Sequence, residues 1–240
     1  MERTAASGPA LQLLAEDLAG RDRGDPIAGE LTGWLATSAR FRAFADAHRD
    51  KIRKKFRGVT DPDALRDVRA ELGAARLLLS DRRVELTFEA YGSGRPGPDF
   101  TVTFRGTQRF NLEVTRVRRV PDTTGLGRVL LAKLRQLPPS APNVVVVAIE
   151  GDTAAAVDVA AATNALRHRA DRKDEAFFVD RGYEGTRGFY ERYLRLSAVL
   201  VWSAGAAAGD RAAWWSNRSA RIALPEPAAR ACAACFRLDP

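Results

Sequence analysis

The chain has 240 residues, of which 45% are hydrophobic and 28% charged; this is globular composition and excludes a largely disordered polymer. Its net charge of +8 and pI of about 10.1 favour an acidic partner such as nucleic acid, although a merely solvated basic surface would give the same balance. The longest apolar runs, at residues 143–149 and 196–202, are too short to span a bilayer. The first residues lack a signal-peptide pattern, so we expect a cytoplasmic protein without a membrane partner.

Helical spacing of apolar residues predicts an N-terminal helical extension over residues 1–58. A turn at residues 21–26 separates its first two helices, and Ser38 is the predicted N-cap of a third helix. The end of that third helix, Arg49 to Arg57, is rich in basic residues and contains one carboxylate, Asp50. Such a run is either a solvated face or a phosphate-binding edge, and its candidate nucleic-acid-binding residues are Arg53, Lys54 and Lys55.

A single large domain is predicted for residues 59–240, and it begins with a helix. Thr60 is expected to cap this helix, Pro62 suits its first turn, and its apolar stripe continues to Leu79. Glu71 falls on or beside the buried side of the stripe, where a carboxylate needs a partner or a function.

Strands are expected next. Residues 84–90 alternate between apolar and polar side chains, as in a half-buried strand. Residues 99–104 and 109–117 are joined by a short turn and predict an antiparallel hairpin. The continuous apolar run at 144–149 predicts a strand that is covered on both faces.

The rest of the chain alternates between predicted helices and strands. We expect helices over 126–137, 154–169 and 226–236, a strand over 196–203, a polar loop over 172–187 and a last strand over 218–224. This order predicts an α/β protein with a mixed sheet that is flanked by helices.

Two acidic residues of the predicted hairpin stand out. Asp99 begins one strand and Glu113 lies in the middle of the other, so strand pairing can bring the two carboxylates side by side. Two like charges repel at that distance unless a cation joins them, and hard oxygen ligands suit Mg²⁺ or Mn²⁺. Together with Glu71, they form a candidate catalytic group of three carboxylates.

The residues Pro98-Asp99 and, further along, Glu113-Val114-Thr115 resemble the motif of the PD-(D/E)XK nuclease superfamily. The helix around Glu71 is similar to that superfamily's first core helix, and the predicted element order over residues 61–149 is its αβββαβ core. The resemblance implies a restriction-endonuclease-like fold, a metal-dependent endonuclease that hydrolyses phosphodiester bonds, and Asp99 and Glu113 as ligands of Mg²⁺ or Mn²⁺. Nucleic acid would be the partner, with DNA favoured over RNA, and the enzyme could act as a homodimer.

The sequence departs from the superfamily at one important position. Thr115 stands where the motif has lysine, and a threonine hydroxyl can hold a water molecule but supplies no charge. We expect Lys133, on the following helix, to replace that lysine. Arginines around the hairpin could contact phosphates, although Arg116 is expected on the opposite sheet face from Glu113; the candidates are Arg105, Arg116 and Arg118.

Two other functions stay open at this point. Because Thr115 replaces the motif lysine, the chain could be an impaired nuclease that serves as a nucleic-acid-binding or partner-binding module. It could also be an interaction protein whose positive charge is incidental. Salt-sensitive binding without cleavage would indicate the first, and no binding at low salt would indicate the second.

Overall fold

The computed structural model describes residues 8–21, 25–91, 97–119, 121–150, 154–203 and 212–237. The chain forms two compact units, Met1–Arg82 and Arg83–Pro240. This division lies later in the chain than the predicted boundary after residue 58, because the helix that follows residue 60 belongs to the first unit.

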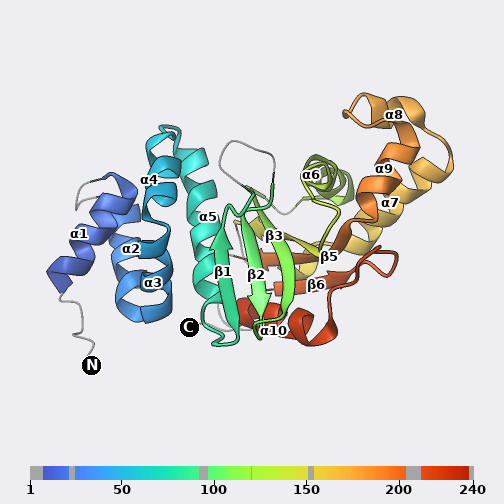
Figure 1. Ribbon diagram of the computed structural model, residues 1–240. Coiled ribbons are helices and arrows are strands. Elements are labelled where there is room, and N and C mark those ends of the chain that lie inside the picture. The colour runs from blue at the N-terminus through green and yellow to red at the C-terminus, as the bar shows by residue number, and fades with distance from the viewer. Residues whose placement is uncertain are drawn as a thin grey trace. The chain divides into compact units, whose positions relative to one another are not determined.

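The first unit consists of helices in its described part (Figure 1). Side chains fix two of their starts: Ser38 accepts a hydrogen bond from the backbone N–H of Phe41, as predicted, and Asp61 accepts one from Asp63. The prediction of Thr60 as the N-cap is therefore wrong by one residue. The predicted third helix is also interrupted, because His48 leaves the helical conformation. The helices are α1 (Gly8–Ala19), α2 (Pro26–Thr37), α3 (Ala39–Ala47), α4 (Arg49–Arg57) and α5 (Pro62–Leu78).

The second unit is built on a six-stranded mixed sheet whose strands lie in chain order (Figure 1). Strands β1 to β3 form the predicted antiparallel meander, β4 and β5 continue it in parallel, and β6 closes it in the antiparallel sense. All residues of β4 and β5 are buried, which agrees with the predominantly apolar sequence of both strands. The strands are β1 (Val84–Phe88), β2 (Phe100–Phe104), β3 (Gln108–Val117), β4 (Asn143–Ile149), β5 (Leu196–Ser203) and β6 (Ala212–Ser216).

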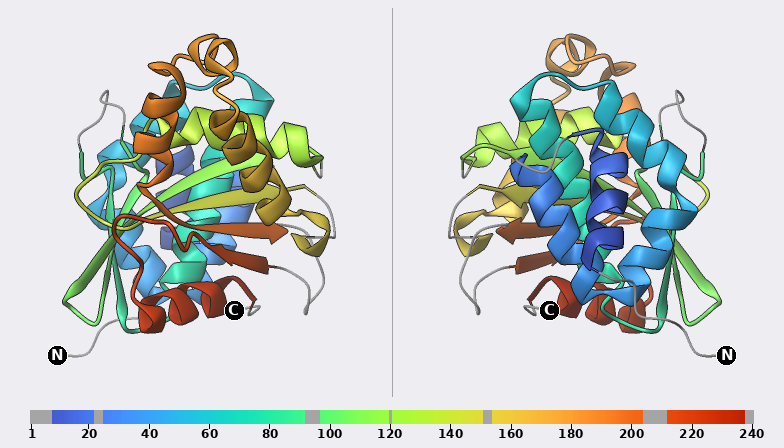
Figure 2. Two further views of the ribbon diagram at one scale, coloured as in Figure 1. Left: turned by 90° about the vertical axis from the view of Figure 1, so that its right-hand side faces the viewer. Right: turned by 90° about the vertical axis from the view of Figure 1, so that its left-hand side faces the viewer.

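Helices cover both faces of this sheet (Figure 2). On one face, alternate residues of β4 and β5 pack in one apolar core with α6 (Thr123–Leu134), α7 (Val159–Asp171), α8 (Glu175–Val179) and α9 (Gly185–Tyr193). A short 3-10 helix, η1 (Ala154–Ala156), precedes α7. On the other face, α10 (Glu226–Arg237) places Phe236 edge-on against Trp202 of β5.

Two predicted segments of this unit are wrong. The expected loop at 172–187 contains α8 and the start of α9, because Phe178 is buried in the core, where its ring packs at a tilt against the ring of Phe189. The expected strand at 218–224 is irregular, and the last strand is instead β6. The α/β class with a mixed sheet flanked by helices is confirmed. None of the helices in the described ranges has the length and apolar character needed to cross a membrane.

Candidate active site

Strand pairing brings Asp99 and Glu113 together at the start of β2. Phe100 pairs with Leu112, so Asp99, one residue earlier, lies across from Glu113. The backbone N–H of Val114 donates to Asp99 Oδ2 at 2.8 Å, which fixes the Asp99 carboxylate against β3. The adjacency that the hairpin predicted is therefore present.

The carboxylate of Glu113 lies on the α6 face of the sheet. In the parallel β3–β4 register, Glu113 pairs with Val145, whose side chain belongs to the apolar core on that face. Only 3% of Glu113 is exposed. Its Oε1 accepts a hydrogen bond from Lys133 Nζ of α6 at 2.6 Å, whereas its Oε2 is buried without a hydrogen-bond partner among the described residues. A buried carboxylate oxygen without a partner is costly, and a bound cation would remove that cost.

The electrostatics of this pair follow from its burial. The pKa of Glu113 is raised from 4.5 to about 7, first because burial disfavours its charge and then because Asp99 is negative, while Lys133 offsets part of the shift. Near pH 7, Glu113 therefore exchanges a proton readily. A shift of this kind, caused by burial and a neighbouring carboxylate together, is typical of catalytic and metal-binding acids.

A buried amide network holds β3 and β4 in register next to the site. Asn111, two residues before Glu113 on the same face, donates to Asn143 Oδ1 at 3.0 Å. Asn143 Nδ2 in turn lies 2.9 Å from the carbonyl oxygens of Pro138, Ala141 and Arg195. The network therefore fixes the strand that carries Glu113. Sequence reasoning missed it, although an asparagine at the start of the apolar β4 run was a signal.

The donor set suits a divalent cation that is completed by other ligands. Among the residues that the structure describes, no group of three or more His, Cys, Asp or Glu side chains could hold a metal ion. Asp99 and Glu113 supply two carboxylates, and Mg²⁺ commonly uses one or two carboxylates together with water and substrate phosphates. The residues present thus fit such an ion when a phosphate is bound.

The other candidates near the hairpin are arranged differently. Thr115 lies on the same face as Glu113, two residues along β3, and is partly exposed. Arg116 does not line the site, because its nearly buried guanidinium pairs with Glu150 at 2.7 Å. Arg105 lies in the turn after β2, at the opposite end of that strand from Asp99, and its guanidinium packs over the ring of Phe104. Arg118 is exposed just beyond the end of β3.

The remaining candidates belong to the first unit. Glu71 of α5 forms an ion pair with Lys55 of α4, and both side chains are largely buried. Lys55 therefore has a carboxylate partner within its own unit, and so does Arg53, whose guanidinium is 3.4 Å from Asp17. Lys54 is exposed.

Comparison with known proteins gives no relative: no family model, no curated protein and no solved structure matches this chain. The function is therefore argued from the geometry of the site.

Proposed function

We propose that the chain is a metal-dependent nuclease that hydrolyses phosphodiester bonds, DNA in preference to RNA, at a site formed by Asp99, Glu113 and Lys133. One observation carries the proposal: the buried Glu113 uses one oxygen to accept from Lys133, and its other oxygen has no partner among the described residues. The opposing Asp99 completes a pair of carboxylates for one cation. The motif resemblance and the positive net charge support a phosphodiester substrate.

In this proposal Mg²⁺ or Mn²⁺ would be held by Asp99 and Glu113, and it would polarise the scissile phosphate and the attacking water. The water oxygen forms a bond to phosphorus while the bond from phosphorus to the leaving sugar oxygen breaks, and that oxygen takes up a proton. Lys133 favours the ionised form of Glu113 and holds its carboxylate in place, and its remaining N–H groups can donate to a phosphate oxygen as negative charge develops there. Thr115 can orient the water through its hydroxyl.

Lys133 supplies the charge that Thr115 cannot. In the motif, the lysine comes two residues after the acidic residue on the same strand, where Thr115 stands here. Lys133 comes from α6 instead and is 21% exposed at its side chain, so it is both bound to Glu113 and accessible from outside. An active site with a relocated lysine is therefore favoured over an impaired one.

The experiment is cleavage of plasmid DNA with Mg²⁺ or Mn²⁺ by the full chain and by Asp99→Asn and Lys133→Ala variants. Glu85→Gln, an exposed residue of the neighbouring strand β1, is the matched control. The proposal predicts cleavage by the parent and the control, loss with Asp99→Asn and at least a large reduction with Lys133→Ala. Equal cleavage by all four proteins would contradict it. Salt-sensitive DNA binding without cleavage by the parent would support the binding-module alternative.

A further inference from the structure

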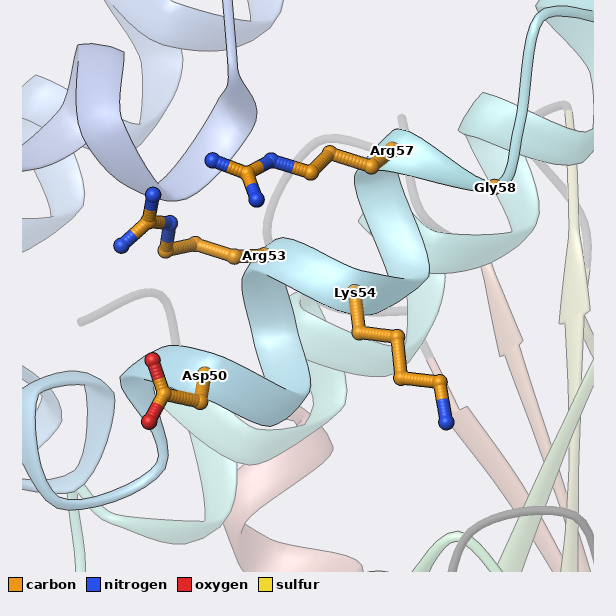
Figure 3. A pocket seen from close by; sticks show the side chains of 5 residues that line it. All are labelled: Asp50, Arg53, Lys54, Arg57 and Gly58. Carbon is orange, nitrogen blue, oxygen red and sulfur yellow. The ribbon is translucent and has the colours of Figure 1, made fainter.

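A basic surface lies on α4, in the first unit, and the proposed catalytic chemistry does not use it. Six of the nine residues of α4 are basic, and the helix contains one carboxylate, Asp50. The apolar Ile52 and Phe56 are buried and Lys55 pairs with Glu71, whereas Lys54 and Arg57 are exposed. A surface hollow of about 540 Å³ is lined by Asp50, Arg53, Lys54, Arg57 and Gly58 (Figure 3).

The arginines of this hollow are repeated along one side of the helix. Figure 3 shows Arg53 and Arg57 extending to the same side, whereas Lys54 points away from them. Four residues of α-helix advance by about 6 Å, so the two guanidinium groups belong to neighbouring turns. Like charges at this spacing repel each other, and an anion bound between them would replace that repulsion by attraction.

A carboxylate of the first unit already pairs with two of these basic side chains. Asp17 is shared by two arginines, at 2.6 Å from Arg49 and 3.4 Å from Arg53. The hollow itself carries three cationic side chains and one carboxylate. The C-terminus of α4 contributes a partial negative charge of about half a unit, which offsets little of the excess. The lining of the hollow is therefore predominantly basic.

We propose that this α4 surface, formed by Arg53, Lys54 and Arg57, binds successive backbone phosphates of the nucleic acid. Guanidinium groups suit bidentate contacts with phosphate oxygens, and cations spread over two turns suit a polymer better than one small anion. A membrane surface is disfavoured, because α4 exposes no large apolar side chain that could enter a bilayer. The surface would hold nucleic acid through contacts that need no metal ion. The substrate class rests on the proposed function, but the charges and geometry of α4 do not.

Metal-free binding tests this surface separately from catalysis. The binding of a labelled DNA duplex to the full chain is measured by fluorescence anisotropy in EDTA, over a series of salt concentrations. The test variant is Lys54→Gln with Arg57→Gln, both exposed in the parent. The control is Lys173→Gln with Arg187→Gln, which removes the same charge from exposed positions in the second unit. Thermal melting of each variant checks folding.

Each phosphate contact contributes about 0.9 to the slope of log K against log salt concentration. The α4 double variant should therefore lower the steepness of that slope by about 1.8, while the control double variant leaves it near the parent value. An unchanged slope in the α4 variant, or an equal change in both, would overturn the proposal. Tighter binding of polyglutamate than of DNA, lost in the α4 variant, would also overturn it in favour of an acidic protein partner. Failure of plasmid cleavage alone would leave this result untouched, because the binding measurement contains no metal.

Discussion

The substitution Glu113→Gln tests whether the site holds a buried carboxylate at a cost in stability. Glutamine has nearly the same shape and can still accept a hydrogen bond from Lys133 through its amide oxygen, but it cannot ionise. In the parent, the folded state raises the pKa of Glu113 from 4.5 to about 7, so between these pH values the folded state binds more protons than the unfolded state. Parent stability should therefore fall as pH rises through this window.

The size of this change in unfolding free energy follows from the ordinary and the raised pKa of Glu113. A rise from 4.5 to about 7 corresponds to about 3 kcal/mol, at about 1.4 kcal/mol for each pH unit. The parent loses no stability from this effect below pH about 4.5. The loss of unfolding free energy grows between the two pKa values and is complete above pH about 7. Relative to the parent, the Glu113→Gln variant should therefore gain about 3 kcal/mol of unfolding free energy between pH 4.5 and pH 8.

The assay is urea unfolding in metal-free buffer at a series of pH values, followed by tryptophan fluorescence. Three of the four tryptophans lie in the second unit, at positions 202, 214 and 215, so the signal reports mainly on the unit that holds Glu113. The exposed Glu85→Gln substitution on β1 is the matched control and should follow the parent curve. If the difference in unfolding free energy between the Glu113→Gln variant and the parent stayed constant with pH, the reasoning would be refuted.

Three further predictions concern the ion pairs and the amide network. Lys133→Ala removes the cation that holds Glu113, so unfolding free energy should fall by about 1–3 kcal/mol and cleavage by about 100-fold or more, measured by urea unfolding and plasmid cleavage. Asn143→Ala removes a buried amide whose nitrogen has three carbonyl acceptors, and should lower unfolding free energy by about 3 kcal/mol in the same urea assay. A double-mutant cycle of Lys55→Met and Glu71→Gln should give a coupling energy of about 1 kcal/mol, and additive effects would show that the pair contributes no stability.

The sequence patterns were sufficient to predict most strands of the sheet. Strict alternation in residues 84–88 is typical of a half-buried strand, and the predominantly apolar runs of β4 and β5 are typical of buried strands. The structure has all three strands at those positions. The hairpin also made the adjacency of Asp99 and Glu113 predictable, because its turn fixes which residues pair.

Other features depend on contacts that no local pattern encodes. The segment at 172–187 looks polar, yet Phe178 is fully buried against Phe189, and tertiary packing turns the segment into helix. The ion pair between Arg116 and Glu150 joins residues that are far apart in sequence, so the loss of Arg116 as a phosphate ligand could not be foreseen. The same holds for Lys55 and Glu71.

Calorimetric titration of Mg²⁺ and Mn²⁺ tests the central proposal most directly. The parent chain is compared at pH 8 with the Asp99→Asn, Glu113→Gln double variant, each alone and with a DNA oligonucleotide present. We expect the parent to bind metal at least when the oligonucleotide is present, and the double variant to lose that binding. Absence of metal binding by the parent under both conditions, or equal binding by the double variant, would contradict a metal-holding pair at Asp99 and Glu113.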